Sequence, residues 1–310
     1  MLNILFSAKP AAWEEYEAPL NAAFRKAGLD VALSRNHPPE AVDYIIFAPN
    51  GPVSDFTPYT RIKAVMGLWA GVETIVNNPT LTQPLCRLVD SSLTEGMVEW
   101  VVGHTMRHHL GMDTHILHQD GIWRDDSFPP LARNRPVTML GIGALGEACA
   151  QALARLGFPV TGWSRSEKQV DGITCLHGED GLAEALQGAE IVILLLPQTP
   201  DTLNILNADT LGLLARGAFI INPGRGPLID DTALLAALDS GQVAHATLDV
   251  FRTEPLPKDH PFWSHRQVTV TPHIASTTRP ETAAAVIAGN IAGYEAGEPL
   301  RYLVDRTRGY

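Results

Sequence analysis

The sequence predicts an α/β protein of two domains in which strands alternate with helices. The chain has 310 residues, which is long for one hydrophobic core and favours two domains. Short runs of β-branched and apolar residues alternate along it with segments of helical periodicity, a pattern typical of parallel sheets. A glycine-rich turn, GIGALG at residues 141–146, separates one such strand from one such helix.

The first hundred residues predict a small α/β domain. A helix is expected over residues 11–27, where an apolar face recurs and Gly28 marks the end. A longer helix is expected over residues 94–118, with Thr94 as its possible N-cap, and it would lead into the next domain. Residues 119–135 are expected to be loop. The predicted strands are the short apolar runs at 2–7, 31–34, 44–48, 62–67 and 87–90.

The glycine turn belongs to a strand–turn–helix–strand unit at residues 136–165. Gly141 would allow the tight turn, Gly143 the approach of a pyrophosphate to backbone amides, and Gly146 the close packing of the helix on the sheet. The helix N-terminus would offer unpaired N–H groups and a positive dipole to the anion. We therefore predict a Rossmann domain that binds a dinucleotide. The buried face of its helix would consist of Leu145, Cys149, Ala152, Leu153 and Leu156.

After residue 165 the alternation of strands and helices continues to the end of the chain. Strands are predicted at 173–176, 191–196, 218–222, 246–250 and 268–271. Helices are predicted at 181–186, 208–214, 232–238 and 280–296. A second glycine-rich nucleotide turn is absent from the sequence, so one cofactor is expected.

The composition excludes several classes of protein. The formal net charge of −11 argues against a nucleic-acid surface, and no apolar run approaches the ~20 residues of a membrane helix. The three cysteines, Cys86, Cys149 and Cys175, form no CxxC pair and no disulfide framework, which fits a reducing compartment. The N-terminal MLNILFSAKP lacks the basic region of a signal peptide. A cytoplasmic protein is expected.

Three polar clusters each follow a predicted strand: NPGRG at 222–226, LDVFRTEP at 248–255 and TPHIAS at 271–276. Ligands of open α/β sheets gather at the carboxyl ends of the strands, so these clusters are candidates for one site. Arg225 could pair with a carboxylate in bidentate geometry. His273 could act as general acid or base, while Glu254 would fix its tautomer and favour its charged form. Each alone could be an ordinary loop residue, but together they suit a 2-oxo acid and a proton transfer.

These clusters also resemble a known family. GIGALG, NPGRG, LDVFRTEP and TPHIA resemble, in order and spacing, the signatures of the D-isomer-specific 2-hydroxyacid dehydrogenases, and the resemblance covers nearly the whole chain. It implies that Arg225 and His273 form the active-site pair and that Glu254 supports the histidine. Further segments, among them GLWAGVETI, LLAALDSGQV and the terminal VDRTRGY, are more similar to members that reduce glyoxylate and hydroxypyruvate. Pro223-Gly224 departs from the small aliphatic pair of many members, and no functional residue is assigned to the atypical helix entry SSLTEGM.

The resemblance further implies a discontinuous fold and a substrate loop. Residues 1–95 with 278–310 would form a flavodoxin-like substrate domain of doubly wound parallel sheet, and residues 96–277 an inserted Rossmann NAD(P)-binding domain. Backbone amides of Ala70, Gly71 and Val72 would help bind the substrate carboxylate, whereas Trp69 is expected to pack. Arg279 could contact the substrate or lie in solvent. A homodimer is implied, with residues 94–135 reaching across to the partner.

Cofactor choice can be predicted from the end of the second Rossmann strand. NAD enzymes usually carry an acid there for the ribose 2′-hydroxyl, whereas this chain has Ser164, Arg165, Ser166 and Lys168. An arginine and two hydroxyls suit a 2′-phosphate and favour NADPH over NADH, although the charge of Glu167 could weaken that preference. The positions expected to contact the cofactor are those four residues together with Gly141, Gly143, Ala144, Leu145, Gly146, Pro197, Thr202, Asn222, Gly224, Asp249 and Ala275.

Alternatives stay open at this point. The preferred 2-oxo acid could be of phenylpyruvate or phosphohydroxypyruvate type, or the chain could be a nucleotide-sensing co-regulator without turnover. His104, His108 and His109 lie in HTMRHH, where metal sites would use the i, i+4 spacing, but neither an HExxH glutamate nor a cysteine cluster accompanies them. We predict no metal and expect these histidines at an interface or in solvent.

Overall fold

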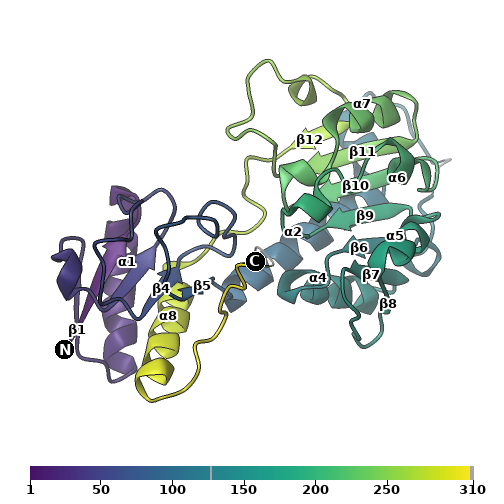
Figure 1. Cartoon of the computed structure of the whole chain (residues 1–310). Helices are drawn as coiled ribbons and strands as arrows, with labels where there is room; N and C mark the ends of the chain where they lie inside the picture. The colour runs from purple at the N-terminus through teal and green to yellow at the C-terminus, as the bar shows by residue number, and fades with distance from the viewer. Residues whose placement is uncertain (126–127, 308–310) are drawn as a thin grey trace. The chain divides into compact units, whose positions relative to one another are not determined.

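The structure is a computed structural model that describes residues 1–125 and 128–307. It divides into two compact units, which we call unit 1 (Met1–Leu93 with Thr277–Tyr310) and unit 2 (Thr94–Ser276) (Figure 1). Each unit is built on a parallel sheet, which confirms the predicted fold class of two parallel-sheet α/β domains. The end of the VDRTRGY motif, residues 308–310, and residues 126–127 of the predicted loop lie outside the described residues.

Unit 1 contains a five-stranded sheet of order β2-β1-β3-β4-β5 in the part of the chain that the structure describes. Alternate strand residues point to opposite faces. One face packs against α1 (Pro10–Lys26) and α8 (Pro280–Glu295), which contribute buried residues such as Leu20 and Ile287. The other face is covered by apolar loop residues such as Phe56. The strands are β1 (Leu2–Ser7), β2 (Val31–Ser34), β3 (Tyr44–Phe47), β4 (Ala64–Gly67) and β5 (Leu85–Cys86).

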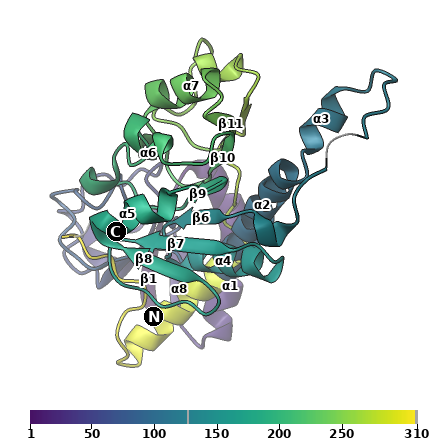
Figure 2. The same ribbon diagram turned by 90° about the vertical axis from the view of Figure 1, so that its right-hand side faces the viewer.

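Unit 2 contains a seven-stranded sheet of order β12-β11-β10-β9-β6-β7-β8 among the described residues, and its paired strands run parallel (Figure 2). From β6 the chain moves to one side through β7 and β8 and then to the other side through β9 to β12. The turn after β6 therefore lies where the strand order reverses, which is the ligand-binding point of a Rossmann sheet. The strands are β6 (Val137–Leu140), β7 (Val160–Ser164), β8 (Thr174–His177), β9 (Ile191–Leu194), β10 (Ala218–Asn222), β11 (Val243–Leu248) and β12 (Val268–Val270). The helices are α2 (Ser91–His109), whose first three residues belong to unit 1, α3 (Met112–Leu117), α4 (Ala144–Arg155), α5 (Gly178–Leu186), α6 (Ala208–Gly212) and α7 (Asp231–Asp239).

The strand predicted at residues 87–90 is wrong. The extended pair is Leu85–Cys86, and residues 87–90 are loop. The backbone N–H of Arg87 donates to the carbonyl of Tyr302, and that of Leu88 donates to the carbonyl of Trp69. These N–H groups donate to loop carbonyls from distant parts of the chain. Residues 87–90 therefore do not extend the sheet, although the run contains apolar residues.

The single helix predicted over residues 94–118 is also wrong. The first helix begins at Ser91, where the Asp90 carboxylate accepts from the backbone N–H of Ser92 at 2.8 Å, so Thr94 lies inside the helix. It ends at His109, and Gly111 adopts a left-handed φ of 62° before α3 begins. Glycine takes this conformation without a steric penalty, which allows the chain to turn there. In α4, Leu156 of the predicted buried face is 48% exposed because it lies beyond the last helical residue.

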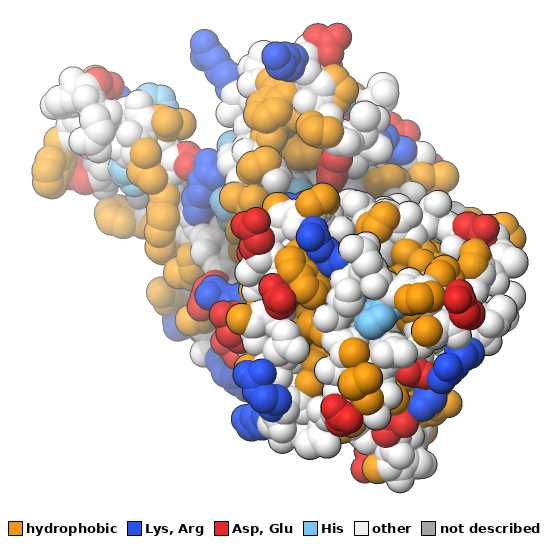
Figure 3. All heavy atoms as spheres, turned by 90° about the vertical axis from the view of Figure 1, so that its left-hand side faces the viewer, with side chains coloured by type: hydrophobic (Ala, Val, Ile, Leu, Met, Phe, Trp, Pro, Cys, Tyr) orange, Lys and Arg blue, Asp and Glu red, His pale blue; other side chains and the backbone are white. Residues whose placement is uncertain are grey.

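The described surface carries charges of both signs. Figure 3 shows one face of the molecule, on which acidic and basic side chains are interspersed. Among the described helices, none has both the length and the apolar composition needed to cross a membrane.

Candidate active site

The three polar clusters come together because their strands are neighbours in unit 2. β10, β11 and β12 lie side by side and run parallel, so their carboxyl ends share one edge of the sheet. Arg225, Glu254 and His273 each follow one of these ends. The local sequence therefore needs only short loops to place a cation, a carboxylate and an imidazole at one edge.

His273 is hydrogen-bonded to Glu254. The distance from its Nδ1 to Glu254 Oε2 is 2.7 Å, and the other carboxylate oxygen accepts from the backbone N–H of Phe251 at 2.9 Å. A carboxylate is an acceptor, so Nδ1 carries the hydrogen of this bond and Nε2 is the nitrogen left to exchange a proton with a ligand. The side chains of His273 and Glu254 are 53% and 34% exposed in the structure. The pair is thus an oriented imidazole at an open edge.

A buried aspartate fixes the backbone of the histidine loop. His273 has a left-handed φ of 55°, which is uncommon for a residue with a Cβ. The Asp249 side chain is fully buried, and its carboxylate accepts from the Thr271 hydroxyl at 2.6 Å and from the backbone N–H groups of Ile274 and Ala275, both at 2.9 Å. The N–H of His273 donates to the Asp249 carbonyl at 2.8 Å. Asp249 therefore holds the turn that presents the imidazole.

The Arg225 loop is fixed in a similar way. The buried Asn222 side chain donates to the carbonyl of Arg225 at 2.9 Å and accepts from the N–H of Gly224 at 3.1 Å. A Cβ atom added at Gly226 would lie 2.0 Å from the carbonyl carbon of Phe251, so only glycine lets the two loops approach this closely. Because Phe251 also donates to Glu254, this contact sets the Arg225 loop directly against the loop that carries Glu254.

The glycine turn after β6 has the shape that a pyrophosphate needs. Gly141 has a φ of 106°, and a Cβ atom added at Gly146 would lie 1.7 Å from the Gly141 carbonyl oxygen. Gly143, the N-cap of α4, has open space where a Cβ would be. The turn is therefore tight at its two outer glycines and open at the middle one, which exposes backbone N–H groups at the start of a helix to an anion.

Other residues predicted to contact the cofactor surround the same edge of unit 2. The Ser164 hydroxyl donates to the carbonyl of Ser166 at 2.7 Å at the end of β7. After β9, the Thr202 hydroxyl donates to the carbonyl of Pro197 at 2.7 Å. Ala275 is buried behind the histidine loop. The polar groups of these turns thus hold the loops themselves in place.

The predicted substrate loop lies in unit 1. Ala70, Gly71 and Val72 follow the carboxyl end of β4, the edge at which a parallel sheet places its ligands. Trp69 is 42% exposed, so it does not pack as fully as the sequence pattern predicts. Arg279 is the N-cap residue of α8, and its carbonyl accepts from Ala283 and from the Thr282 hydroxyl.

Comparison with known proteins identifies the family. Residues 101–275 match the model of the D-isomer specific 2-hydroxyacid dehydrogenase, NAD binding domain. The chain belongs to this family. It is 43% identical over 257 residues to glyoxylate/hydroxypyruvate reductase A of Yersinia enterocolitica, a match that covers 81% of this chain and 82% of the relative.

Solved structures of other members of the dehydrogenase family have the same fold. A D-isomer specific 2-hydroxyacid dehydrogenase from Xanthobacter autotrophicus in complex with NADPH and MES superposes with a TM-score of 0.93 at 40% identity, over 99% of both chains. An NADPH-dependent glyoxylate/hydroxypyruvate reductase from Sinorhizobium meliloti in complex with NADP and sulfate gives a TM-score of 0.89 at 33% identity, over 100% of both chains.

In this dehydrogenase His108 and His109 of α2 are buried inside unit 2, so the expectation that they lie at an interface or in solvent is wrong for these two residues. The His108 ring stacks on Phe219 with 4.8 Å between centroids, and its Nε2 lies 2.9 Å from the Thr247 hydroxyl. Burial lowers the pKa of His108 to about 3. The His109 ring contacts Phe158 edge-on. Within the described residues, no group of three or more His, Cys, Asp or Glu side chains is arranged to hold a metal ion.

Two structural roles could not be assigned from the sequence motifs alone. Asp249 stays a predicted cofactor contact, and the motif alone did not show that its carboxylate holds the His273 loop. NPGRG predicts a role for Arg225, but the motif did not show that Gly226 allows the Arg225 loop to approach the backbone of Phe251. A usable signal existed in both cases: an acid at the end of an apolar strand must find donors, and a glycine after a functional residue permits close backbone approach.

Proposed function

We propose that this dehydrogenase uses NADPH to reduce glyoxylate to glycolate and hydroxypyruvate to D-glycerate. The observation that carries the proposal is the 2.7 Å pair of His273 and Glu254 beside the Arg225 loop, in a chain that is 43% identical to a glyoxylate/hydroxypyruvate reductase A. The open glycine turn of unit 2 fits a nicotinamide dinucleotide, which would supply the hydride.

In the proposed reaction each residue has one task. Arg225 binds the 2-oxo acid carboxylate through its guanidinium fork and polarises the neighbouring ketone. His273 donates the proton on Nε2 to the oxygen as negative charge develops there. Glu254 keeps the proton on Nδ1 and stabilises the imidazolium before the transfer. The family resemblance further assigns the amides of Ala70, Gly71 and Val72, and the side chain of Arg279, to substrate binding.

The preference for NADPH rests on the end of β7. Ser164, Arg165, Ser166 and Lys168 offer two cations and two hydroxyls where NAD enzymes carry an acid. A 2′-phosphate would pair with the Arg165 guanidinium as a bidentate, charge-assisted contact. The neighbouring Glu167 would reduce this preference without reversing it.

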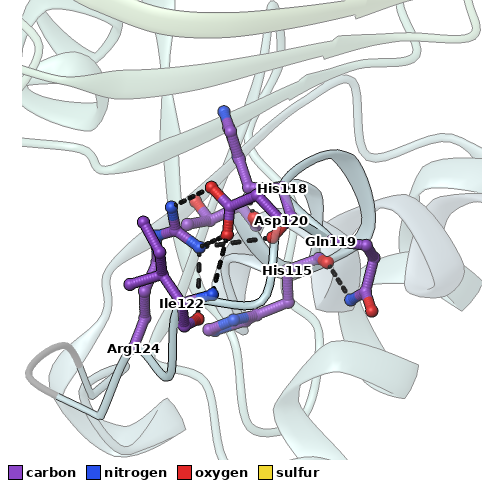
Figure 4. Close-up of polar contacts among 7 residues, drawn as sticks. His115, His118, Gln119, Asp120, Ile122 and Arg124 are labelled. Carbon is purple, nitrogen blue, oxygen red and sulfur yellow. Dashed lines mark hydrogen bonds and ion pairs between the residues drawn. The ribbon is translucent and has the colours of Figure 1, made fainter.

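We further propose that the protein is a cytoplasmic homodimer in which residues 94–135 reach across to the partner. We call the described residues 110–125 and 128–131 of this segment the arm. The arm is held by its own polar contacts: Arg124 binds both oxygens of Asp120, at 2.7 and 2.6 Å, and Gln119 donates to the carbonyl of His115 (Figure 4). The Arg124 guanidinium lowers the pKa of Asp120 to about 2. The apolar side chains of the arm remain largely exposed, namely Ile116, Leu117, Ile122, Trp123, Phe128 and Leu131. A preformed arm with exposed apolar side chains fits an interface with a second copy.

A substrate panel with each cofactor tests the reductase. We expect NADPH to support reduction of glyoxylate and hydroxypyruvate with higher kcat/KM than phenylpyruvate or phosphohydroxypyruvate, and NADH to be the poorer cofactor. A preference for a bulky 2-oxo acid, or for NADH, would contradict the corresponding part of the proposal. Tight nucleotide binding without turnover of any 2-oxo acid would favour a co-regulator. Light scattering of the same preparation measures whether the protein is a dimer.

A further inference from the structure

Arg165 has an acidic neighbour on the far side of the nucleotide turn. Its Nη1 lies 3.9 Å from Oδ2 of Asp201, and the two side chains are 48% and 75% exposed. Arg165 follows β7, whereas Asp201 lies in the short helix η3 (Pro200–Thr202) after β9. Because β7 and β9 flank β6 in the sheet, the ion pair spans the strand that ends in the glycine turn.

The backbone on both sides of this pair is well fixed. Thr199 and Thr202 form a reciprocal capping box at the start of η3, and the Thr202 hydroxyl also donates to the Pro197 carbonyl. On the other side, the Ser164 hydroxyl donates to the carbonyl of Ser166. The backbone of Asp201 is therefore held within reach of Arg165, and both side chains are partly exposed to solvent.

We propose that Asp201 is a specificity-determining residue that limits the preference for NADPH by competing with the 2′-phosphate for Arg165. The inference rests on the proposed use of Arg165 in cofactor binding. A 2′-phosphate carries a charge of about −1.5 to −2 at pH 7, so it must displace the Asp201 carboxylate and then lie close to it. The ribose diol of NADH carries no such charge and leaves the pair intact. Asp201 should therefore weaken the binding of NADPH and leave the binding of NADH unchanged.

The effect of Asp201 on NADPH binding should be small because the ion pair with Arg165 is exposed. Exposed ion pairs contribute little and are screened by salt. Removing the carboxylate should lower the KM for NADPH by about two- to five-fold at low ionic strength, within the range of a single exposed charge contact. The same change should leave the KM for NADH within error.

The experiment compares Asp201→Asn with the wild-type enzyme and with Asp209→Asn, which removes the same charge from α6. We expect Asp201→Asn to raise the NADPH/NADH ratio of kcat/KM. This increase should be smaller in about 0.5 M KCl, which screens the charges. Asp209→Asn should leave the ratio unchanged. In an Arg165→Gln background the competition for the guanidinium is absent, so Asp201→Asn should raise the ratio less than it does in the wild-type background. An unchanged ratio in Asp201→Asn, or a weaker use of NADPH, overturns the inference.

Direct binding separates this inference from the proposed function. Affinities for NADP⁺ and NAD⁺, measured by calorimetry for the same variants, require no turnover. If the enzyme reduces neither glyoxylate nor hydroxypyruvate, the proposed function fails, while a tighter NADP⁺ complex of Asp201→Asn still supports the role of Asp201. If the wild-type enzyme is active but Asp201→Asn binds NADP⁺ no more tightly, the inference fails and the proposed function stands.

Discussion

The proposed site of unit 2 has two regions that are held in different ways. We call them the catalytic end, which consists of the loops of Arg225, Glu254 and His273, and the end of β7, which carries Arg165. At the catalytic end, the fully buried Asp249 accepts three hydrogen bonds from the loop of His273, and Gly226 presses the Arg225 loop against its neighbour. At the end of β7, Arg165 and Asp201 are 48% and 75% exposed and are joined by one 3.9 Å ion pair. The first end is fixed by buried contacts, and the second depends on charges in solvent.

This difference follows from what each end must do. Proton transfer requires donor and acceptor within hydrogen-bond distance, so small displacements cost a large part of the rate. Selection between two cofactors by charge works over several ångströms and tolerates mobile side chains. Changes at the catalytic end should therefore lower turnover with either cofactor, and changes at the end of β7 should alter only the ratio between cofactors.

The largest effect is expected for His273→Ala. Loss of the proton donor should lower kcat by about 10²- to 10⁴-fold with both NADPH and NADH, while binding of NADPH remains largely intact. Steady-state kinetics and calorimetric titration with the cofactor measure the two quantities. His177→Ala, at an exposed position at the end of β8, is the matched control and should retain activity. Unchanged turnover in His273→Ala would overturn the assignment of the general acid.

A smaller loss is expected for Gly226→Ala. The new Cβ would meet Phe251 backbone at 2.0 Å, so the loops of Arg225 and Glu254 must separate. A displacement of about 1 Å in a catalytic group can cost roughly 10²-fold in rate, and we expect a loss of that order in kcat with both cofactors. In Gly212→Ala the added methyl group meets open space at the end of α6, so activity should be retained. If both alanine variants are equally active, the loop contact does not position the site.

The sequence was sufficient for features that depend on local pattern. The glycine turn after β6 and the clusters at the ends of β10, β11 and β12 follow from short apolar runs and the residues directly after them. The sequence was insufficient where contacts with distant segments determine the bounds of a strand or the burial of a side chain. Leu85–Cys86 forms the strand because it pairs with β4, and Cys86 also bridges to Leu303 of the C-terminal tail. Periodicity along α2 could not show that His108 faces the sheet and stacks on Phe219.

The histidine conformation was also beyond prediction from the sequence. TPHIAS predicts a histidine after a strand, but its left-handed φ depends on the carboxylate of Asp249, which lies 24 residues earlier in the chain. The assignment of site residues from motifs stays a prediction, and the variants described above test it at both ends of unit 2.

At the end of β7, Arg165→Gln should change cofactor choice alone. Loss of the charged contact should lower kcat/KM for NADPH by about ten-fold, the equivalent of about 1.4 kcal/mol, and leave that for NADH within about two-fold. Arg155→Gln, in the last turn of α4, provides a control with the same loss of charge. An equal loss of kcat/KM with both cofactors would show that Arg165 does not bind the 2′-phosphate.

The smallest effect concerns the buried support of the catalytic end, and it depends on pH. Thr247, which His108 contacts, lies in β11 two residues before Asp249. Burial lowers the pKa of His108 to about 3 and that of neighbouring His245 to about 4, whereas an unfolded histidine has a pKa of about 6.5. His245, Arg107 and His104 further lower the pKa of His108, and Asp113 opposes them.

Since the unfolded chain binds protons that the folded one does not, the free energy of unfolding should fall as pH decreases below about 6.5. One such histidine contributes about 1.4 kcal/mol per pH unit when only the unfolded form is protonated. We expect His108→Gln, which keeps a hydrogen-bonding side chain but cannot titrate, to reduce the loss of stability between pH 6 and pH 5 by about that amount. Urea unfolding at the two pH values measures it, with the exposed His118→Gln as control. If His108→Gln loses as much stability as the wild-type protein between the two pH values, protonation of the buried histidine is not what destabilises the protein in acid.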